Sequence, residues 1–356
     1  MDAGLNSGQL TLRDNVRDVL RTECPPGIAR QAMTDPERWR TVWKTVVDLG
    51  WAELATPGRG DFGSIDLAVV AEECGAAIAP IPLLSSVGLA AGVLRAAGSA
   101  VDDVLRDIGG GVVAALAVHS PAARLPGVPM TLRHGRLRGR AVAVADLARA
   151  ELVVTLAACD GGVVVAAART GDGVTVEPVE CINPAQPVAD VEIDTTPVVT
   201  APVDVESALA SPLMAAAADL VGVASAALAR SVEHAKARRQ FGKPIGAFQG
   251  VKHALADNYV GLERARSLTY AAAARLDDPA TTPAAGWTAA ALAKAAAGDA
   301  AVNCSRTAVQ VHGAIAQTWE HDIHLYLRRA WQSAAALGDS RALYHAVGRR
   351  VAGGAA

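Results

Sequence analysis

Aromatic residues are scarce in this chain of 356 residues: Phe, Trp and Tyr together make up 4% of it, although 51% of the residues are hydrophobic. A core with few large rings must be built from Ala, Val and Leu, and such small side chains favour helices that pack at short distances. The length exceeds what one hydrophobic core usually serves, so we expect two or three domains.

A strong net charge is also missing. The formal value of -3 provides no field that would attract nucleic acid or an anionic membrane, so we exclude both as partners. Lysine is rare, because 28 of the 33 basic Lys and Arg residues are arginines. The position of each lysine is therefore of interest, and Lys243 and Lys252 fall within one motif.

Paired cysteines and a targeting segment are absent as well. The five cysteines are odd in number, scattered and without a C-x-x-C pair, which is typical of buried thiols in a reducing cytoplasm. The N-terminus has no cationic run followed by an apolar stretch, so we expect no signal peptide. Residues 212–229 reach membrane-spanning length, but they are rich in alanine and interrupted by Asp219, which predicts a buried core helix.

The hydrophobic pattern changes twice along the chain. Residues 1–110 show helical periodicity, and residues 111–205 contain short β-branched runs between Gly, Asp and Pro. Residues 206–356 are helical again. We therefore predict an α+β multidomain protein with an N-terminal helical domain, a middle β domain and a C-terminal helical domain.

Helix signals can be placed within the third region. Ser211 and Pro212 look like an N-cap and a first-turn proline of a helix that runs to about Arg239. A second helix is expected to begin near Phe248, and a third to run from about Trp287 to Val311 after a turn at 277–283.

The link between the first two of these helices reads "RRQFGKPIGAFQGVKH", residues 238–253. Pro244 prevents a continuous helix, and three glycines let the backbone bend. Arg238 and Arg239 end one helix, while free amides near Phe248 begin the next, so donors could converge on a phosphate or pyrophosphate. An ordinary turn with arginines at a helix C-terminus is the alternative.

The same stretch, extended to residue 257, resembles the signature of the acyl-CoA dehydrogenase family. Residues 310–330, "QVHGAIAQTWEHDIHLYLRRA", resemble a second signature of that family, and the order of helical, strand and helical regions agrees with it. The resemblance implies an N-terminal all-α domain, a middle β-barrel or sandwich, a C-terminal four-helix bundle, and FAD as cofactor.

In that family the adenosine and pyrophosphate half of each FAD is held by the neighbouring subunit. The resemblance assigns this role to Arg238, Gln240 and Phe241, and to Gln310 and Gly313 at the end of a later helix. Arginine pairs with phosphate through a fixed fork, and glycine lets the backbone approach a cofactor. Ala314 stands where the family usually has a second glycine, and we keep it in the assignment.

The family's catalytic base is what this chain lacks. The reaction removes the α proton of a thioester while the β hydrogen leaves as hydride to flavin N5, and the proton needs a carboxylate acceptor. Counting through the second signature places Leu337 at the usual position of this base, and Pro212 lies at or near the position that a minority of members use. Asp219 and Asp339 are possible substitutes, although pairing or capping is the expected role of Asp219.

The residues that hold the flavin ring in the family are also depleted. In "AVHSPAARLPG", residues 117–127, only Pro121 matches the family pattern, and residues 137–154 contain no aromatic side chain. Three histidines, His312, His321 and His324, suggest a zinc site, but no Cys or carboxylate set accompanies them at ligand spacing.

Because this chain keeps the residues that bind the nucleotide and lacks the catalytic base, it resembles the heteromeric branch of the family, known from bacterial degradation of steroid side chains. This implies a subunit that pairs with a base-bearing partner in an α2β2 tetramer, acts on an acyl-CoA and passes electrons to an electron-transfer flavoprotein. Two alternatives remain at this stage: a cofactor-free structural subunit, and a homotetrameric enzyme with an unrecognised base.

Overall fold

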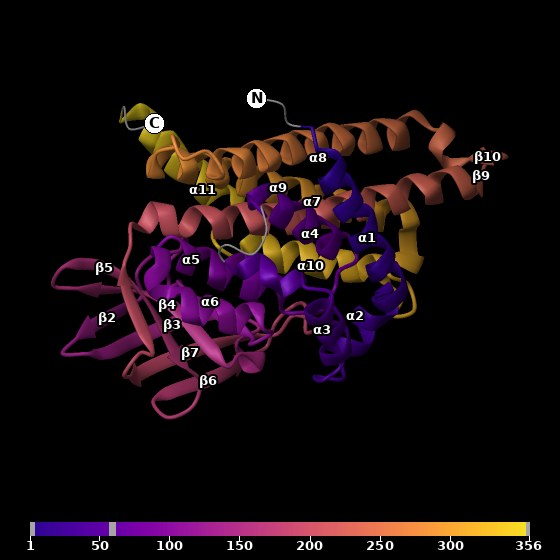
Figure 1. Cartoon of the computed structure of the whole chain (residues 1–356). Helices are drawn as coiled ribbons and strands as arrows, with labels where there is room; N and C mark the ends of the chain where they lie inside the picture. Colours follow the sequence, from indigo (N-terminus) through magenta and orange to yellow (C-terminus); the bar gives the residue numbers. More distant parts are fainter. Residues whose placement is uncertain (1–3, 57–61, 354–356) are drawn as a thin grey trace.

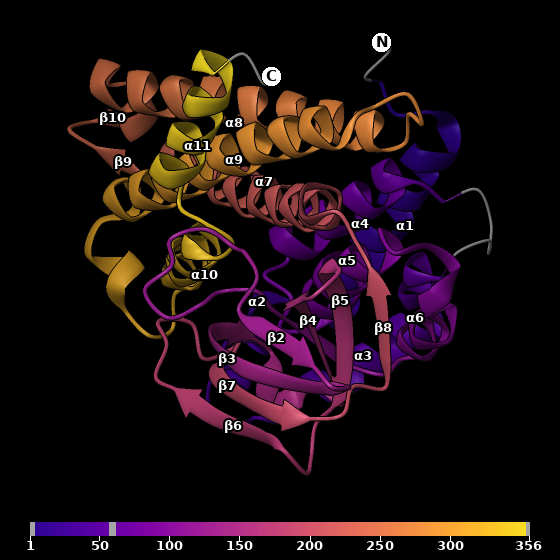
Figure 2. The same ribbon diagram turned by 90° about the vertical axis from the view of Figure 1, so that its left-hand side faces the viewer.

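The computed structural model describes residues 4–56 and 62–353. Helices, strands and again helices follow one another along the chain, as the sequence predicts. Three long helices, α7 (Val205–Ala237), α8 (Gln249–Leu276) and α9 (Pro283–His312), form one layer of the molecule (Figure 1). The sheet lies beneath one end of this layer, and the N-terminal helices flank both (Figure 2).

The N-terminal region consists of short helices whose apolar stripes face the common core. In the first of them, for example, Val16 and Leu20 are completely or almost completely buried. The helices are α1 (Ser7–Glu23), α2 (Pro26–Ala32), α3 (Trp39–Asp48), η1 (Trp51–Ala55), α4 (Ser64–Ala76), η2 (Leu84–Ala90), α5 (Ala91–Arg95), η3 (Gly98–Val101) and α6 (Asp102–Gly109).

The middle region forms one eight-stranded sheet in the order β6-β7-β3-β2-β4-β5-β8, with β1 beside β4. The strands are β1 (Ala114–Ala117), β2 (Met130–Arg133), β3 (Arg136–Ala145), β4 (Leu152–Cys159), β5 (Gly162–Arg169), β6 (Val174–Val179), β7 (Val188–Thr195) and β8 (Val199–Pro202). Five of them coincide with the β-branched runs of the sequence. A register shift between Ala141 and Val144 forms a bulge in β3, and Val142 and Ala143 within it line the cavity described below.

Helix α7 begins earlier than the sequence suggested. Its N-cap is Asp204, whose carboxylate accepts a hydrogen bond from the amide of Ser207 at 2.8 Å, so Pro212 lies inside the helix. The prediction of a helix start at Ser211 was therefore wrong, because the proline signal was given more weight than a capping aspartate seven residues upstream. Helix α9 likewise begins at Pro283, capped by Thr282, and not at Trp287.

The body of α7 is the central helix of the molecule. Residues Leu213–Val223 are buried in an unbroken run that packs against α4, α8 and α9. The helix is long and apolar enough to cross a membrane by length and composition, but 83% of its most apolar window is buried inside the protein. This agrees with its prediction as a core helix.

Two glycines let α4 and α7 cross at very short distance. A Cβ atom added to Gly222 would lie 1.8 Å from the carbonyl oxygen of Glu72, and one added to Gly75 would lie 2.0 Å from that of Asp219. Backbone therefore contacts backbone at this crossing. It is the closest form of the small-residue packing that the composition predicts.

Gly222→Ala is expected to destabilise the protein by about 1–3 kcal/mol, because the added methyl group would push α4 away from α7. Gly261→Ala is a matched control: it lies inside α8, where an added Cβ meets no atom within 4 Å. There the loss of a helical glycine should be neutral or stabilising. Urea denaturation of both variants measures the difference, and equal stability of the two would show that the crossing has room for a side chain.

Candidate functional site

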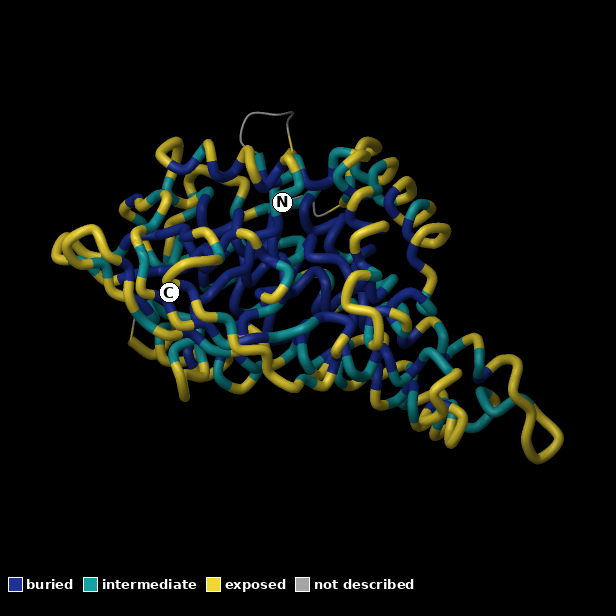
Figure 3. The backbone as a smooth tube through the Cα atoms, turned by 90° about the horizontal axis from the view of Figure 1, so that it is seen from below, coloured by how far each residue is buried: buried dark blue, intermediate teal, exposed yellow. Residues whose placement is uncertain are grey.

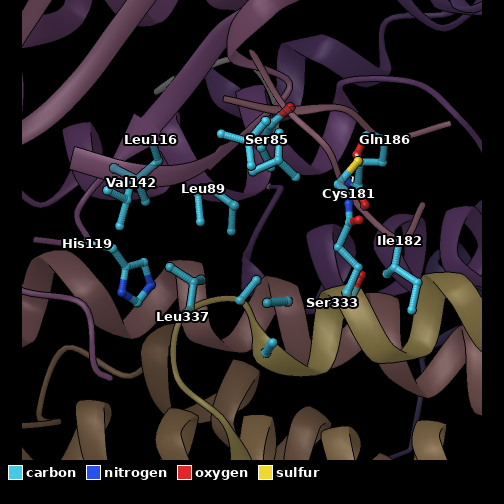
Figure 4. A pocket seen from close by; sticks show the side chains of 18 of the residues that line it. Ser85, Leu89, Leu116, His119, Val142, Cys181, Ile182, Gln186, Ser333 and Leu337 are labelled. Carbon is cyan, nitrogen blue, oxygen red and sulfur yellow. Dashed lines mark hydrogen bonds between the residues drawn. The ribbon is translucent and has the colours of Figure 1, made fainter. Parts of the chain in front are cut away.

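A cavity of about 580 Å³ lies between the sheet and the C-terminal helices (Figure 4). Its walls come from η2, the segments that follow β1 and β6, the bulge of β3, helix α7, and the end of α10 (Ile323–Ala335) with its loop to α11 (Ser340–Ala352). The lining is mainly apolar. Large side chains in it include Leu84, Leu89, Leu116, Val142, Ile182 and Leu337.

Polar groups in the wall are mostly paired with one another. Ser85 Oγ donates to Asp146 Oδ2 at 2.8 Å, and Gln332 Nε2 donates to the carbonyl oxygen of Gln186 at 2.7 Å. His119 differs, because its Nε2 is buried and has no hydrogen-bond partner among the described residues. Burial lowers the pKa of the His119 ring, so at neutral pH the group that faces the cavity beside Leu337 is a neutral imidazole (Figure 4).

The ring of FAD does not fit this lining well. One edge of an isoalloxazine carries several hydrogen-bonding groups, whereas His119 Nε2 is the one fully buried side-chain nitrogen or oxygen in the lining that has no hydrogen-bond partner. Trp331 is the one Phe, Tyr or Trp side chain among the lining residues, and it lies on α10 and not on the sheet. The cavity suits an apolar group better than a flavin ring.

Leu337 occupies the wall where the resemblance places a base. It is 4% exposed and adopts a left-handed conformation with φ of 55°, followed by Gly338 with φ of 97°. A non-glycine residue pays a backbone cost in this region, so the loop is shaped to direct the side chain at position 337 into the cavity. The side chain at this position is that of a leucine, which cannot accept a proton.

The second expected base position needs correction. Helix α7 presents Ala216 to the cavity, one turn after Pro212, while Pro212 packs beside Gly92 of α5. The prediction that Pro212 stands near the site was therefore displaced by about one helical turn. Neither residue carries an acid. Asp219 does not line the cavity, and its carboxylate binds Arg329 at 2.5 Å, which is the pairing that the sequence predicts.

Three carboxylates border the cavity, and each has another role or location. Asp339 Oδ2 accepts from Arg124 at 2.6 Å and Oδ1 accepts from the amide of Ala342, which caps α11. The hydrogen bond from Arg124 lowers the pKa of Asp339. Asp190 accepts from a backbone amide of the β3 bulge at 3.0 Å, and Glu180 is exposed. Asp339 is thus a capping and pairing residue and not a free base.

Lys294 is a residue that sequence reasoning missed. It lies on α9, is 1% exposed, and its ammonium donates to the carbonyl oxygens of Ala334 at 3.1 Å and Gly338 at 3.3 Å. It therefore fixes the loop that carries Leu337. The signal was available, since a rare lysine stands in an otherwise Ala-rich helix.

Lys294 should make stability depend on pH. Burial lowers its pKa to about 7, against the opposing effect of Asp339 and Asp219. Between about pH 7 and the ordinary lysine pKa, the unfolded chain binds a proton that the folded chain does not, so the free energy of unfolding rises with pH. The slope is at most about 1.4 kcal/mol per pH unit.

We expect this rise to be missing in Lys294→Met. The free energy of unfolding of the variant is subtracted from that of the wild type at each pH, which cancels the contribution of other titrating groups. These groups include the buried thiols of Cys24 and Cys304, because burial raises the pKa of each. Urea denaturation at pH 6.5, 7.5 and 8.5 measures it, with exposed Lys252→Met as control. Parallel curves for wild type and Lys294→Met would contradict the prediction.

The motif at 238–244 forms a hairpin that projects from the end of the molecule. Strands β9 (Arg239–Gln240) and β10 (Lys243–Pro244) are joined by Phe241 and Gly242, which both have positive φ. The hairpin is the exposed loop at one end of the backbone in Figure 3. It extends away from the eight-stranded sheet (Figure 1).

Phe241 is unusual within this hairpin. Its φ is 52°, a conformation that costs about 1 kcal/mol for a side chain of this kind, and it is nevertheless 90% exposed. Its ring meets Phe248 edge to face at 6.0 Å, and Lys243 lies over the Phe248 ring. A strained and exposed aromatic contributes little to the chain's own core, so it is available to a molecule outside it.

The second motif lies beside the first. His312 at the end of α9 stacks on His234 of α7, with ring centroids 4.2 Å apart. His234 lies one helical turn before Arg238. Gln310, Gly313 and Ala314, which flank His312, are exposed. The structure therefore places the ends of α7 and α9 in contact, and the two groups of residues assigned to the nucleotide extend from these ends. Gly313 has φ of 69° and ψ of -148°, which only glycine adopts readily.

A metal site is not formed here. His321 contacts His312, but His324 stacks on Trp319 instead. Within residues 4–56 and 62–353, no group of three His, Cys, Asp or Glu side chains could hold a metal ion.

The hairpin cannot reach the cavity of its own chain. Ala216 lines the cavity and Ala237 ends α7, and the 21 residues between them span about 30 Å at the standard helical rise. The arginine Arg238 has no ion-pair partner among the described residues, so it is free to bind an anion that a second subunit presents.

Two family models match the chain, the acyl-CoA dehydrogenase N-terminal domain at residues 6–101 and the acyl-CoA dehydrogenase C-terminal domain at residues 205–352. Among curated relatives, the acyl-CoA dehydrogenase IpdE2 of Mycolicibacterium smegmatis is 32% identical over 339 residues, which cover 93% of this chain and 94% of the relative. The acyl-CoA dehydrogenase FadE27 of Mycobacterium tuberculosis is 30% identical, with 95% of each chain covered.

Solved structures give the same result. A chain of the ChsE4-ChsE5 complex from Mycobacterium tuberculosis superposes with a TM-score of 0.87 at 26% identity, covering 99% of both chains. A chain of the Tcur3481-Tcur3483 steroid ACAD superposes with a TM-score of 0.81 at 26% identity, covering 97% of this chain and 99% of that one. Both of these relatives are complexes of two different chains.

Proposed function

The chain belongs to the acyl-CoA dehydrogenase family, whose members are oxidoreductases that act on CH–CH donors and use FAD, and from this membership we propose that it is the base-lacking subunit of a heteromeric acyl-CoA dehydrogenase. In this proposal a partner subunit contributes the catalytic base and the pocket for the flavin ring. This chain contributes the site for the adenosine and pyrophosphate half.

One observation carries the proposal: this chain has residues that suit the nucleotide end of a flavin, but it has no catalytic base in the cavity where the flavin ring would lie. The cavity contains Leu337 in place of an acid and has a mainly apolar lining, whereas the hairpin exposes an unpaired arginine and an aromatic ring about 30 Å away along α7. A chain with both halves intact could serve two flavins of a homodimer. A chain with this arrangement serves only the flavin of its neighbour.

Each residue of the hairpin half-site has a defined task. The Arg238 guanidinium pairs with a phosphate through two parallel N–H donors, and Phe241 offers an exposed ring to an aromatic base or ribose. Gly313 lets its backbone approach the nucleotide, since no side chain intervenes. When bound, FAD supplies the hydride acceptor of the reaction, while the residues of this chain hold its nucleotide end.

The partner is a base-bearing member of the same family, and the assembly is an α2β2 tetramer with one FAD per heterodimer. The relatives that form complexes of two chains support this part of the proposal, and the Tcur3481-Tcur3483 relative is a steroid ACAD. A bulky, steroid-like acyl-CoA is accordingly the proposed substrate class. Electrons leave to an electron-transfer flavoprotein, and the enzyme works in the cytoplasm.

Co-expression with candidate base-bearing partners tests the proposal. We expect the complex to contain one flavin per heterodimer and to oxidise acyl-CoA with a dye acceptor, and each chain alone to be inactive. Replacing the base of the partner by its amide should abolish activity without loss of flavin. A stable, yellow preparation of this chain alone that oxidises acyl-CoA would contradict the proposal.

A further inference from the structure

Three histidine rings meet where the ends of α7 and α9 come together. His234 and His312 stack with ring centroids 4.2 Å apart, and His321 meets His312 edge-on at 5.0 Å. All three residues are half-buried. His312 directly precedes Gly313, and His234 lies one helical turn before Arg238. This histidine cluster therefore adjoins both groups of residues that the proposed function assigns to the nucleotide end of FAD.

Hydrogen bonds determine which ring nitrogen of the cluster can accept a proton. His312 Nδ1 lies 2.8 Å from the carbonyl oxygen of Ala308, and a carbonyl only accepts, so Nδ1 carries the hydrogen. In the neutral ring Nε2 is then bare, and it has no hydrogen-bond partner among the described residues. His321 differs, because its Nδ1 accepts from the amide of Ile323 at 3.3 Å. His312 Nε2 can therefore take up a proton without breaking a hydrogen bond.

Two guanidinium groups of α7 act on the cluster and oppose its protonation. Burial is the largest cause that lowers the pKa of His234, and Arg238 acts in the same direction. Burial also lowers the pKa of His312, to which Arg230 and the two neighbouring rings contribute. The hydrogen bond to Ala308 opposes these effects without reversing them. At neutral pH the stacked rings are therefore uncharged in the free protein.

The carboxylates around the cluster do not neutralise it. Asp322, which follows the third histidine, pairs with Arg30 at 2.6 Å and with Arg230 at 3.7 Å. Glu233 and Glu320 are exposed, and the former pairs with a lysine of α7. Within the part of the chain that the structure describes, no carboxylate forms an ion pair with a histidine of the cluster. A negative charge at this place must come from a ligand.

We propose that the histidine cluster takes up one proton, at His312 Nε2, when the nucleotide end of FAD binds. The phosphates of FAD are negatively charged throughout the range in which histidine titrates. Bound at Arg238, they offset the field of that guanidinium and favour a charged imidazole nearby. A second proton is excluded, because two charged rings would then stack at 4.2 Å. This inference rests on the proposed function, since it needs the nucleotide end at this half-site.

Binding of FAD should become weaker as the pH rises. The pKa of His312 lies below its ordinary value in the free protein because of burial, and bound phosphate raises it. The gain in affinity is therefore complete below the free pKa and is lost as the pH rises through the raised one. One proton limits the slope to about tenfold per pH unit, and we expect about three- to tenfold in all between pH 6 and 8.

Titration of the flavin-free heteromeric complex with FAD at pH 6, 7 and 8 provides the test. The ratio of wild-type affinity to that of His312→Gln should fall about three- to tenfold from pH 6 to 8. The ratio isolates the cluster, because groups of the partner subunit contribute equally to both affinities. His345→Gln on α11, an exposed histidine outside the cluster, is the matched control, and its ratio should stay constant.

A purely structural role of the stack predicts a different result. His312→Gln would then weaken FAD by the same factor at every pH, and such a constant ratio would overturn the inference. A ratio that rises with pH would overturn it as well, because protonation would then push the ends of α7 and α9 apart and release the nucleotide.

Calorimetry on the wild-type complex keeps the inference falsifiable if the variant fails to fold. At pH 6.5, the heats of FAD binding in two buffers of different ionisation enthalpy give the number of protons exchanged. We expect net uptake of a fraction of one proton, and zero uptake or net release would overturn the inference.

The proposed function and this inference have separate readouts. The flavin content of the complex at one pH measures the proposed function, whereas the change of affinity with pH measures the inference. A complex that holds no flavin at any pH contradicts the proposed function. A complex that holds flavin with a pH-independent ratio contradicts the inference alone.

Discussion

Arg238→Ala is expected to remove most of the flavin from the heteromeric complex. Its guanidinium has no partner within the described part of the chain, and a charge-assisted pair with phosphate contributes about 1.5–3 kcal/mol. This corresponds to a loss of about 10- to 100-fold in flavin affinity. The measurement is the ratio of flavin absorbance to protein after gel filtration, with titration of added FAD to determine the affinity.

The activity of this variant provides a second measurement. At saturating FAD the rate per bound flavin should return to the wild-type value, because Arg238 does not contact the reacting atoms. Lys236→Ala is the matched control, since it removes a neighbouring exposed cation that is paired with Glu233 at 2.8 Å. Full retention of flavin by Arg238→Ala would instead support a subunit with a purely structural role.

Asp219→Ala is expected to destabilise the fold by about 3–5 kcal/mol, the largest effect on stability among the substitutions considered. Asp219 and Arg329 are 1% and 3% exposed, and their side chains meet in a two-point contact of 2.5 and 3.3 Å. Removing the carboxylate leaves the Arg329 guanidinium buried without a counter-charge. Chemical denaturation, or the midpoint of thermal unfolding, measures the loss.

A double variant distinguishes this cause from a simple cavity. Asp219→Leu combined with Arg329→Met replaces the charges by apolar groups of similar size, and it should recover most of the stability lost in the single variant. The buried charge then accounts for the effect. If the double variant is no more stable than Asp219→Ala, packing at the crossing of α4 and α7 is responsible instead.

The order of helices and strands could be predicted from the sequence, because the spacing of apolar residues that distinguishes a helix from a strand is set by residues close together in the chain. The break between two helices at residues 238–253 could also be predicted, since Pro244, the glycines and two arginines are neighbours in the chain, but the two short strands within it could not. Strand β2 and the start of β3 were harder to recognise, because most of their exposed positions are arginines and few of their positions are apolar. The predicted beginnings of α7 and α9 were wrong: Pro212 was taken for a first-turn proline although Asp204 caps α7, and residues 277–283 were assigned to a turn although Thr282 caps α9.

The cavity itself could not be predicted. Its wall combines residues such as Leu84, Val142, Ile182 and Leu337, which are separated by dozens of positions and are individually ordinary core side chains. The family resemblance located Leu337, but the facing residue of α7 was misplaced by one turn. Lys294 stands out in the sequence as a rare lysine in an Ala-rich helix, but its role could not be predicted, because its hydrogen-bond partners are the backbone carbonyl groups of Ala334 and Gly338.

The length of α7 has a consequence for how such an enzyme would behave on dilution. The cavity and the hairpin lie about 30 Å apart along α7, so one chain cannot hold both ends of a dinucleotide. In the proposed complex, FAD binding is therefore linked to subunit association by mass action. Loss of colour should then follow protein concentration, and an excess of free FAD should hold the two different chains together.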